Sequence, residues 1–270
     1  YIAWYEKMPL SKWQHHTSCL RLSIPDIIPH NIDRILWLDC DMVVRTNLKE
    51  IFDIDMGNAL AIVAEDKISD CRRKSSRQIN WIGLDFQGYL DSIGLSKDAQ
   101  LFNAGFLFIN VKLWREIDIH RKFDEYVSKY HNALAYSDND ILNYVLQDKV
   151  KYISNYWNLI PSLDSDYYPT IPDLRDIHIL HYAATKPLNP QCTDKFYLEE
   201  FWKYFFLTPY FKENPAEYIN TIVEQKINAH NQNIRKLARA LTCWIPIRKW
   251  RRHYRNKIFM QPDTLYTLHS

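Results

Sequence analysis

The sequence of 270 residues predicts an α/β fold in which a mostly parallel sheet is flanked by helices. Short runs rich in apolar, β-branched and aromatic residues recur along the chain, and polar residues bound each run. Segments with helical spacing lie between these runs. Strands that alternate with helices favour a mostly parallel sheet covered on both faces. The length suits one large domain, or one domain with a smaller appendage.

The expected strands are spread along most of the main domain. They cover residues 34–39, 59–66, 102–110, 149–154 and 177–182. Helical spacing is strongest over 121–135 and 139–147. Ligands of such sheets bind beyond the carboxyl ends of the strands, so functional residues are expected there.

The composition changes after residue 204. We expect residues 1–204 to form the main domain and residues 205–270 to form a helical, basic C-terminal region. Nine of the 34 basic residues lie between Arg235 and Lys257, where no acidic residue occurs, so the rest of the chain is mildly acidic. Basic segments interleaved with Leu, Ile and Trp are typical of the surface of an anionic membrane. Nucleic-acid binding and a solvated face are the alternatives.

Cysteine usage and hydropathy exclude several classes of protein. The five cysteines are scattered and form no CxxC pair, so neither a disulfide framework nor a structural zinc site is expected. A reducing compartment is therefore the default. No apolar run reaches the ~18 residues that would span a bilayer.

Two carboxylates, Asp39 and Asp41, end the first expected strand, with Cys40 between them. Side chains two residues apart on an extended strand point the same way. Both can therefore face one hard cation such as Mn²⁺ or Mg²⁺, which often bridges a protein carboxylate to a diphosphate. The alternative is a pair of loop aspartates at the start of a helix near residue 46 or 47.

The run RILWLDCDMVV is followed in order by FNAGFLFINVKLWR, YSDNDILNYVL and HYAATKP. Together these four motifs, over roughly residues 18–190, resemble family 8 glycosyltransferases. The resemblance implies a GT-A-like (Rossmann-like) catalytic domain and a retaining enzyme that moves galactose or glucose from a UDP-sugar. It also implies a lipid-linked lipopolysaccharide or oligosaccharide acceptor. The enzyme would be cytoplasmic and peripheral on the inner face of the cytoplasmic membrane, and its partners would not include nucleic acid.

The resemblance also assigns roles to individual residues. The implied metal ligands, for Mn²⁺ or Mg²⁺, are Asp39, Asp41 and His181. The implied nucleotide-sugar residues are Arg21, Asp39, Cys40, Asp41, Asn103, Ala104, Gly105 and Lys186. The implied catalytic residues are Asp138, Asn139 and Asp140. Simpler explanations stay open: a surface arginine, a solvated lysine, a strand-end histidine, and aspartates that cap a helix.

Some positions depart from the family pattern. The family usually has a Gly between the His and the Lys, where this chain has Ala184 and Thr185, and Leu188 replaces a Trp. Asn139 replaces a longer Gln. The earlier strand unit that binds uridine in the family has no counterpart before Arg21, so we expect an N-terminally incomplete catalytic domain.

A phosphatase of the haloacid-dehalogenase type is the main alternative. Its DxDx[TV] strand end is similar to DCDMVV, with Asp39 as nucleophile, Asp41 as general acid–base and Mg²⁺ as cofactor. Its later acidic metal motif is not found, and HYAATKP would go unexplained. A non-catalytic remnant is the third possibility.

Overall fold

The computed structural model describes residues 16–74, 78–79, 82–160, 175–183, 186–190, 192 and 195–259. The chain divides into two compact units, Tyr1–Ala183 and Ala184–Ser270, and each is described here by itself. The division follows Ala183, whereas the change of composition in the sequence comes after residue 204.

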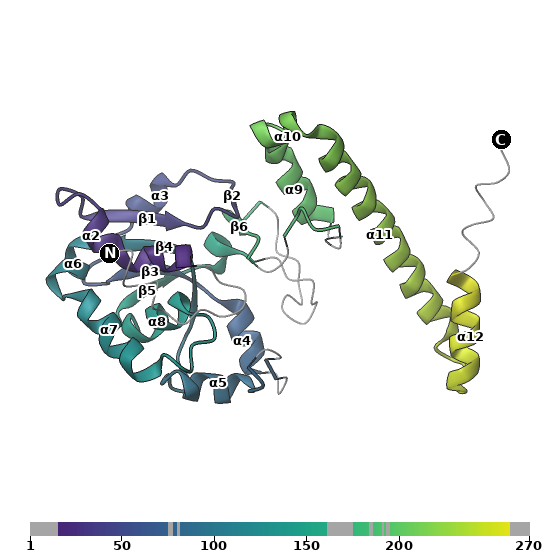
Figure 1. The fold of residues 1–270 in the computed structure, drawn as a ribbon, viewed down its shortest axis with the longest axis horizontal. Helices are drawn as coiled ribbons and strands as arrows, with labels where there is room; N and C mark the ends of the chain where they lie inside the picture. Colours follow the sequence, from purple (N-terminus) through teal and green to yellow (C-terminus); the bar gives the residue numbers. More distant parts are fainter. Residues whose placement is uncertain are drawn as a thin grey trace. The chain divides into compact units, whose positions relative to one another are not determined.

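A four-stranded sheet forms the centre of the first unit, in the order β1-β4-β3-β5 (Figure 1). Its strands are β1 (Arg34–Leu38), β3 (Ala61–Glu65), β4 (Phe102–Asn110) and β5 (Val150–Ile153). β3 and β5 pair in parallel, whereas β4 is antiparallel to both β1 and β3. Three of the four strands therefore point the same way. The predicted α/β fold is confirmed, as a mixed sheet in which β4 alone is reversed.

The side chains of β4 enter two different cores because successive residues of a strand point to opposite faces. Leu107 and Ile109 pack into one hydrophobic cluster, with Trp114 and Phe123. Phe106 and Phe108 pack into another. Covering both faces explains why the central strands are almost continuously apolar rather than alternating.

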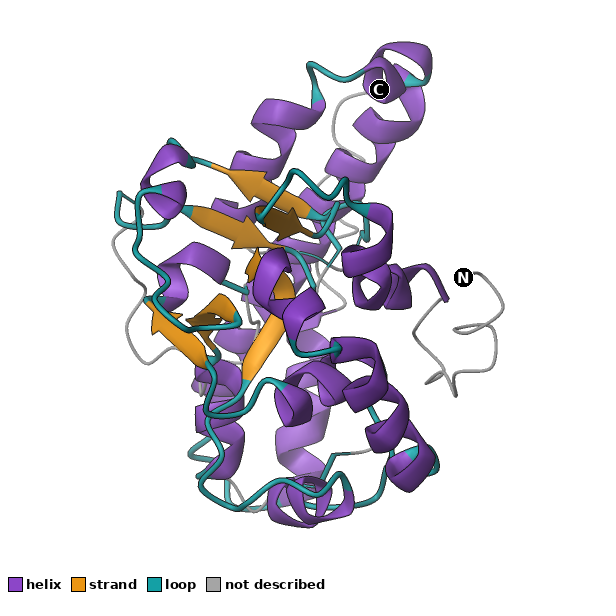
Figure 2. Cartoon of the chain, turned by 90° about the vertical axis from the view of Figure 1, so that its left-hand side faces the viewer, coloured by secondary structure: helices purple, strands orange, loops and turns teal. Residues whose placement is uncertain are grey.

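Helices of the first unit surround these strands (Figure 2). The helices α6, α7 and α8 supply the first cluster, and α3 contributes to the second. The helical elements are η1 (His16–Ser23), α2 (Ile24–Ile27), α3 (Lys49–Phe52), α4 (Lys67–Arg73), α5 (Phe86–Ser92), α6 (Val111–Glu116), α7 (Ile119–Tyr130), α8 (Asp138–Val145) and η2 (Asn155–Asn158).

A second, two-stranded sheet brings distant parts of the chain together. β2 (Met42–Val44) pairs antiparallel with β6 (Ile179–His181), and Met42 lies opposite His181. A parallel bridge between Leu159 and Leu180 ties the segment after η2 to the same strand. The loop that contains Asp39 and Asp41 is thereby held beside His181.

The second unit is helical. Its helices are α9 (Lys195–Phe205), α10 (Pro209–Glu213), α11 (Pro215–Thr242) and α12 (Arg248–Phe259). The buried Trp202 of α9 donates from its indole N–H to Gln225 Oε1 of α11 at 3.3 Å. Of the helices that the structure describes, none has the length and hydropathy needed to cross a bilayer.

Candidate active site

The loop between β1 and β2 carries Asp39 and Asp41, and backbone hydrogen bonds fix it to two other strands. The Asp39 N–H donates to the carbonyl oxygen of Gly105 in β4 at 3.0 Å. The N–H of Tyr182, directly after β6, donates to the Asp41 carbonyl oxygen at 2.9 Å. The end of β1 therefore presents both carboxylates beside β4 and β6.

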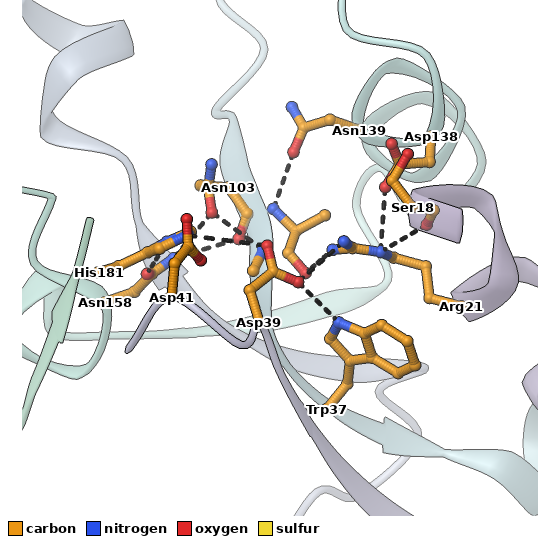
Figure 3. Close-up of polar contacts among 12 residues, drawn as sticks. Ser18, Arg21, Trp37, Asp39, Asp41, Asn103, Asp138, Asn139, Asn158 and His181 are labelled. Atoms are coloured by element: carbon orange, nitrogen blue, oxygen red, sulfur yellow. Dashed lines mark hydrogen bonds and ion pairs between the residues drawn. The ribbon is translucent and has the colours of Figure 1, made fainter. Parts of the chain in front are cut away.

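His181 completes a cluster of three potential metal ligands (Figure 3). Its side chain is 2% exposed, and its Nε2 lies 3.2 Å from Asp41 Oδ1 and 3.7 Å from Asp39 Oδ2. The ligand atoms of the three residues all lie within 4.8 Å of one another. Two carboxylates and one imidazole form a donor set that suits Mn²⁺ better than Ca²⁺. The residues present therefore fit a divalent transition-metal ion.

A chain of amides fixes the orientation of the His181 ring. The Gly105 N–H donates to Asn103 Oδ1 at 2.9 Å, so that atom is the oxygen of the amide. Asn158 Nδ2 donates to the same Oδ1 at 3.2 Å, which leaves Asn158 Oδ1 facing His181 Nδ1 at 2.9 Å. Because an amide oxygen only accepts, the proton of neutral His181 belongs on Nδ1. The lone pair of Nε2 then points toward the carboxylates, as a metal ligand requires.

Gly105 is needed beneath the same ring. A Cβ at this position would lie 2.8 Å from His181 Nδ1 and would overlap the neighbouring ring carbon. Such an approach leaves no room for a methyl group. The Gly of the FNAG motif therefore allows β4 to pass directly under the imidazole.

Arg21 connects the metal-ligand cluster to α8. The residue is 5% exposed, which places it in the interior rather than on the surface. Its Nη2 lies 2.8 Å from Asp39 Oδ1, its Nε lies 3.0 Å from Asp138 Oδ2, and Nη1 donates to the carbonyl oxygen of Ala104. Trp37 donates from Nε1 to the same Asp39 oxygen at 3.0 Å, and the centre of its ring lies 5.0 Å from the Arg21 guanidinium carbon.

Asp138 begins α8, directly after Ser137, whose φ of 47° is unusual for a residue other than glycine. The Asp138 residue is 3% exposed. Burial raises the pKa of its carboxyl group to about 6, and the negative charges of Asp39 and Asp140 act in the same direction. The Arg21 guanidinium opposes this rise in the pKa. Asp138 is thus a carboxylate whose charge is balanced mainly by one arginine.

Asn139 and Asp140 are occupied by contacts within the protein. Asn139 Oδ1 accepts from the Ala104 N–H at 2.8 Å. Asp140 is fully buried and accepts from the Tyr89 hydroxyl at 2.5 Å and from the N–H groups of Ala135 and Tyr136 at 2.7 and 2.8 Å. Burial raises the pKa of Asp140 to about 6, while these hydrogen bonds lower it. Asp140 therefore holds the loop that leads into α8 in place through these hydrogen bonds.

The structure brings most of the predicted site residues together (Figure 3). Cys40 is exposed between the two aspartates. Lys186 is exposed and belongs to the second unit, while Ala184 and Thr185 lie outside the described residues. The residues gathered in the first unit are Arg21, Asp39, Asp41, Asn103, Ala104, Gly105, Asp138, Asn139 and His181.

Three residues that contribute side-chain contacts to the site were not predicted from the sequence. Trp37 lies two residues before Asp39 in the strand expected over residues 34–39, a spacing that places both side chains on one face and could have been used. Asn158 and Tyr89 lie in segments with no motif. Their contacts span 23 residues to His181 and 51 residues to Asp140, respectively.

Comparison with known proteins adds independent findings. The family model of glycosyl transferase family 8 matches residues 3–189, a range that contains every site residue named above. Glycosyltransferase GlyB of Streptococcus pneumoniae is 28% identical over 211 residues, which are 74% of this chain and 44% of GlyB. Lipopolysaccharide 1,3-galactosyltransferase of Salmonella typhimurium is 24% identical over 67% of this chain and 52% of that protein. The chain thus spans about half, or less, of the curated relatives it matches.

Solved structures are similar over the same region. The galactosyltransferase LgtC, crystallised with donor and acceptor sugar analogues, is 27% identical with a TM-score of 0.57, covering 73% of this chain and 70% of its own. The bifunctional glycosyltransferase WbbM, in its apo form, has a TM-score of 0.61 at 23% identity, covering 76% of this chain and 38% of WbbM. The second likeness bears on the fold alone, and both are GT-A-like.

Proposed function

Because this chain belongs to glycosyl transferase family 8, we propose that it is a metal-dependent, retaining glycosyltransferase. Its donor is a UDP-hexose, with galactose or glucose as the transferred sugar. The observation that carries the proposal is the convergence of Asp39, Asp41 and His181 within 4.8 Å, beside the buried Arg21–Asp138 pair. The comparisons offer no support for the phosphatase alternative.

In this proposal, Asp39, Asp41 and His181 hold Mn²⁺ or Mg²⁺. When bound, the cation offsets the negative charge that develops on the departing UDP. Asn158 keeps the His181 lone pair directed at the ligand position, and Arg21 holds Asp39 in place while leaving Asp39 Oδ2 on the His181 side. The chain thus preorganises the ligand set before the donor arrives.

Asp138 acts on the sugar. Its carboxylate stabilises the positive charge that forms at the anomeric carbon as the bond to the diphosphate breaks. The acceptor hydroxyl attacks from the face that UDP leaves, so the configuration is retained, and its proton passes to the departing diphosphate. Asn139 and Asp140 act as positioning residues, since their oxygens hold the FNAG segment and the loop before α8.

We further propose that the acceptor is a lipid-linked oligosaccharide of lipopolysaccharide type. Residues 205–270 would then attach the enzyme peripherally to the inner face of the cytoplasmic membrane. Support comes from the names of relatives such as the 1,3-galactosyltransferase of Salmonella typhimurium. The basic helices with exposed Leu, Ile and Trp side chains are further support. Lys186 would neutralise diphosphate oxygens as a point charge.

Calorimetry of UDP binding tests the site. The expected result is UDP binding that requires Mn²⁺, is lost in Asp39→Ala and His181→Ala, and persists in Asp98→Ala, which removes an exposed aspartate outside the cluster. UDP binding of equal affinity with and without Mn²⁺ would contradict the proposed site. Release of phosphate from a simple phosphomonoester, abolished by Asp39→Asn, would establish the phosphatase instead.

A further inference from the structure

Trp37 and Arg21 contact the same atom of one candidate metal ligand (Figure 3). The indole N–H of Trp37 donates to Asp39 Oδ1 at 3.0 Å, and Arg21 Nη2 lies 2.8 Å from that oxygen. A carboxylate oxygen has about two lone-pair positions, so these two donors occupy Oδ1. The other oxygen, Oδ2, lies on the side of His181, 3.7 Å from its Nε2. The protein thus occupies one oxygen of Asp39 and directs the other at the ligand cluster.

The fold holds both donors in place. Trp37 belongs to β1, where it lies opposite Leu107 of β4, and its side chain packs against the hydrophobic cluster that contains Leu107. The centre of its ring lies 5.0 Å from the Arg21 guanidinium carbon, a distance at which a cation and an aromatic ring attract each other. Arg21 is 5% exposed and is also held by Asp138 Oδ2 at 3.0 Å. The two donors therefore fix the orientation of the Asp39 carboxylate.

Divalent cations differ in how they use a carboxylate. Ca²⁺ takes about six to eight oxygens at about 2.3 to 2.6 Å and commonly binds both oxygens of one carboxylate. Mg²⁺ is smaller and requires near-octahedral geometry at about 2.0 to 2.1 Å, and Mn²⁺ also accepts octahedral sites. A carboxylate that offers only Oδ2 therefore suits Mg²⁺ or Mn²⁺ better than it suits Ca²⁺.

We propose that Trp37 is a positioning residue that selects the metal ion by restricting Asp39 to coordination through one oxygen. The indole N–H keeps Oδ1 occupied, so Ca²⁺ gains the second carboxylate oxygen only by displacing this hydrogen bond. A hydrogen bond to a charged group corresponds to about ten-fold in an equilibrium constant. The inference rests on the metal site proposed above and adds to it a selectivity against Ca²⁺.

Replacing Trp37 with Phe isolates this effect. Arg21 stays on Oδ1 through one lone pair, while the other lone pair becomes available to a cation. The Phe ring keeps an apolar contact with the hydrophobic cluster and an aromatic face for the guanidinium group. The nitrogen of His181 favours Mn²⁺ over Ca²⁺ to the same extent before and after the substitution. The substitution therefore changes the number of oxygens that Asp39 offers, and leaves the charge of the site unchanged.

The test measures the preference for Mn²⁺ over Ca²⁺ and does not depend on activity. The full chain is titrated with Mn²⁺ while electron paramagnetic resonance reports the free ion, and Ca²⁺ is then added as a competitor, so that one sample yields both dissociation constants. The control for Trp37→Phe is Trp114→Phe, in the cluster that Trp37 packs against. The Trp114 indole N–H donates to the Leu60 carbonyl oxygen at 2.9 Å rather than to a carboxylate. Circular dichroism and urea unfolding check that each variant is folded.

The ratio of the Ca²⁺ to the Mn²⁺ dissociation constant should fall about ten-fold in Trp37→Phe and change by less than about two-fold in Trp114→Phe. Trp37→Leu also lacks the donor and should show the same fall, so either variant decides the question if the other does not fold.

A weakening of both ions by the same factor in the Trp37 variants would leave the ratio unchanged and overturn the inference, because a merely structural role predicts that result. An equal fall of the ratio in Trp114→Phe would overturn it as well. Wild-type protein that binds Mn²⁺ and Ca²⁺ equally well would refute the selectivity while leaving the metal site standing. Wild-type protein that binds no Mn²⁺ would overturn the metal site and the inference together.

Discussion

Replacing Arg21 with Met tests whether one buried cation balances two carboxylates of the site. Arg21 lies 2.8 Å from Asp39 Oδ1 and 3.0 Å from Asp138 Oδ2. The Asp39 side chain is 25% exposed, so water can solvate its carboxylate once Arg21 is removed, whereas the Asp138 side chain is 4% exposed and stays dry. The loss of stability on substitution therefore comes mainly from the unpaired charge of Asp138. Removing one partner of a buried ion pair destabilises a protein by about 3 to 5 kcal/mol.

The pH dependence of this loss identifies the carboxylate responsible. The folded pKa of Asp138, about 6, lies above its ordinary value of 3.8. Folding therefore takes up a proton between these values, and stability from this group rises as the pH falls. Without Arg21 the pKa rises further. Moving from about pH 5 to about pH 7.5 costs the wild type about 1.4 kcal/mol, and it costs the variant more because its Asp138 must give up a more tightly held proton. The destabilisation should thus be larger at the higher pH, by up to about 1.4 kcal/mol for each unit by which the pKa rises.

Urea unfolding at the two pH values, in the presence of a chelator, measures this difference. The chelator prevents a metal ion from holding Asp39 in place of the arginine. Arg115→Met is the matched control because Arg115 donates to the carbonyl oxygens of Pro25 and Ile28, at 3.0 and 2.6 Å, rather than to a carboxylate. The destabilisation caused by Arg115→Met should not depend on pH. An equal loss at both pH values for Arg21→Met would refute the assignment of the raised pKa to Asp138.

Three further substitutions address the remaining contacts of the site. Asn158→Leu removes the partner of His181 Nδ1, and calorimetry should show Mn²⁺ binding weakened by about 10- to 100-fold; unchanged affinity would contradict its positioning role. Gly105→Ala places a methyl group against the same ring, which should lower the free energy of unfolding by about 1 to 3 kcal/mol. Asp140→Asn removes an acid whose pKa is raised to about 6 by burial. The wild type should therefore gain about 1.4 kcal/mol relative to this variant between about pH 7.5 and pH 5, a difference that urea midpoints would reveal or exclude.

The strands were predictable because their cause is local. Each strand of the central sheet coincides with an apolar run in the sequence. The two inner strands, β3 and β4, are largely apolar because both of their faces are buried. The reversal of β4 was not predictable. Its sequence is as apolar as that of β3, and its direction is set by how the connecting helices return the chain, which no residue of the strand encodes.

The site was predictable only where a short motif marks it. Asp39 and Asp41 were found because both follow an apolar run. They lie after β1 in the turn that leads into β2 rather than on an extended strand, and it is this turn that directs both side chains toward His181. Which other groups surround them depends on contacts that the sequence pattern does not contain. Arg21 comes from a 3-10 helix ahead of β1, and Asn158 comes from another after β5. A polar residue in such a segment looks the same whether it faces solvent or the site.

The contrast between the two acidic pairs shows how much the local backbone decides. Asp138 and Asp140 have the same i, i+2 spacing as Asp39 and Asp41, but they lie on a helix, where that spacing turns side chains by about 200°. They therefore face opposite ways: Asp138 faces Arg21, and Asp140 faces Tyr89 and the loop before α8. A trio of residues that looks like one catalytic motif in the sequence is thus divided in space. We accordingly assign the charge at the sugar to Asp138 and a positioning role to Asp140.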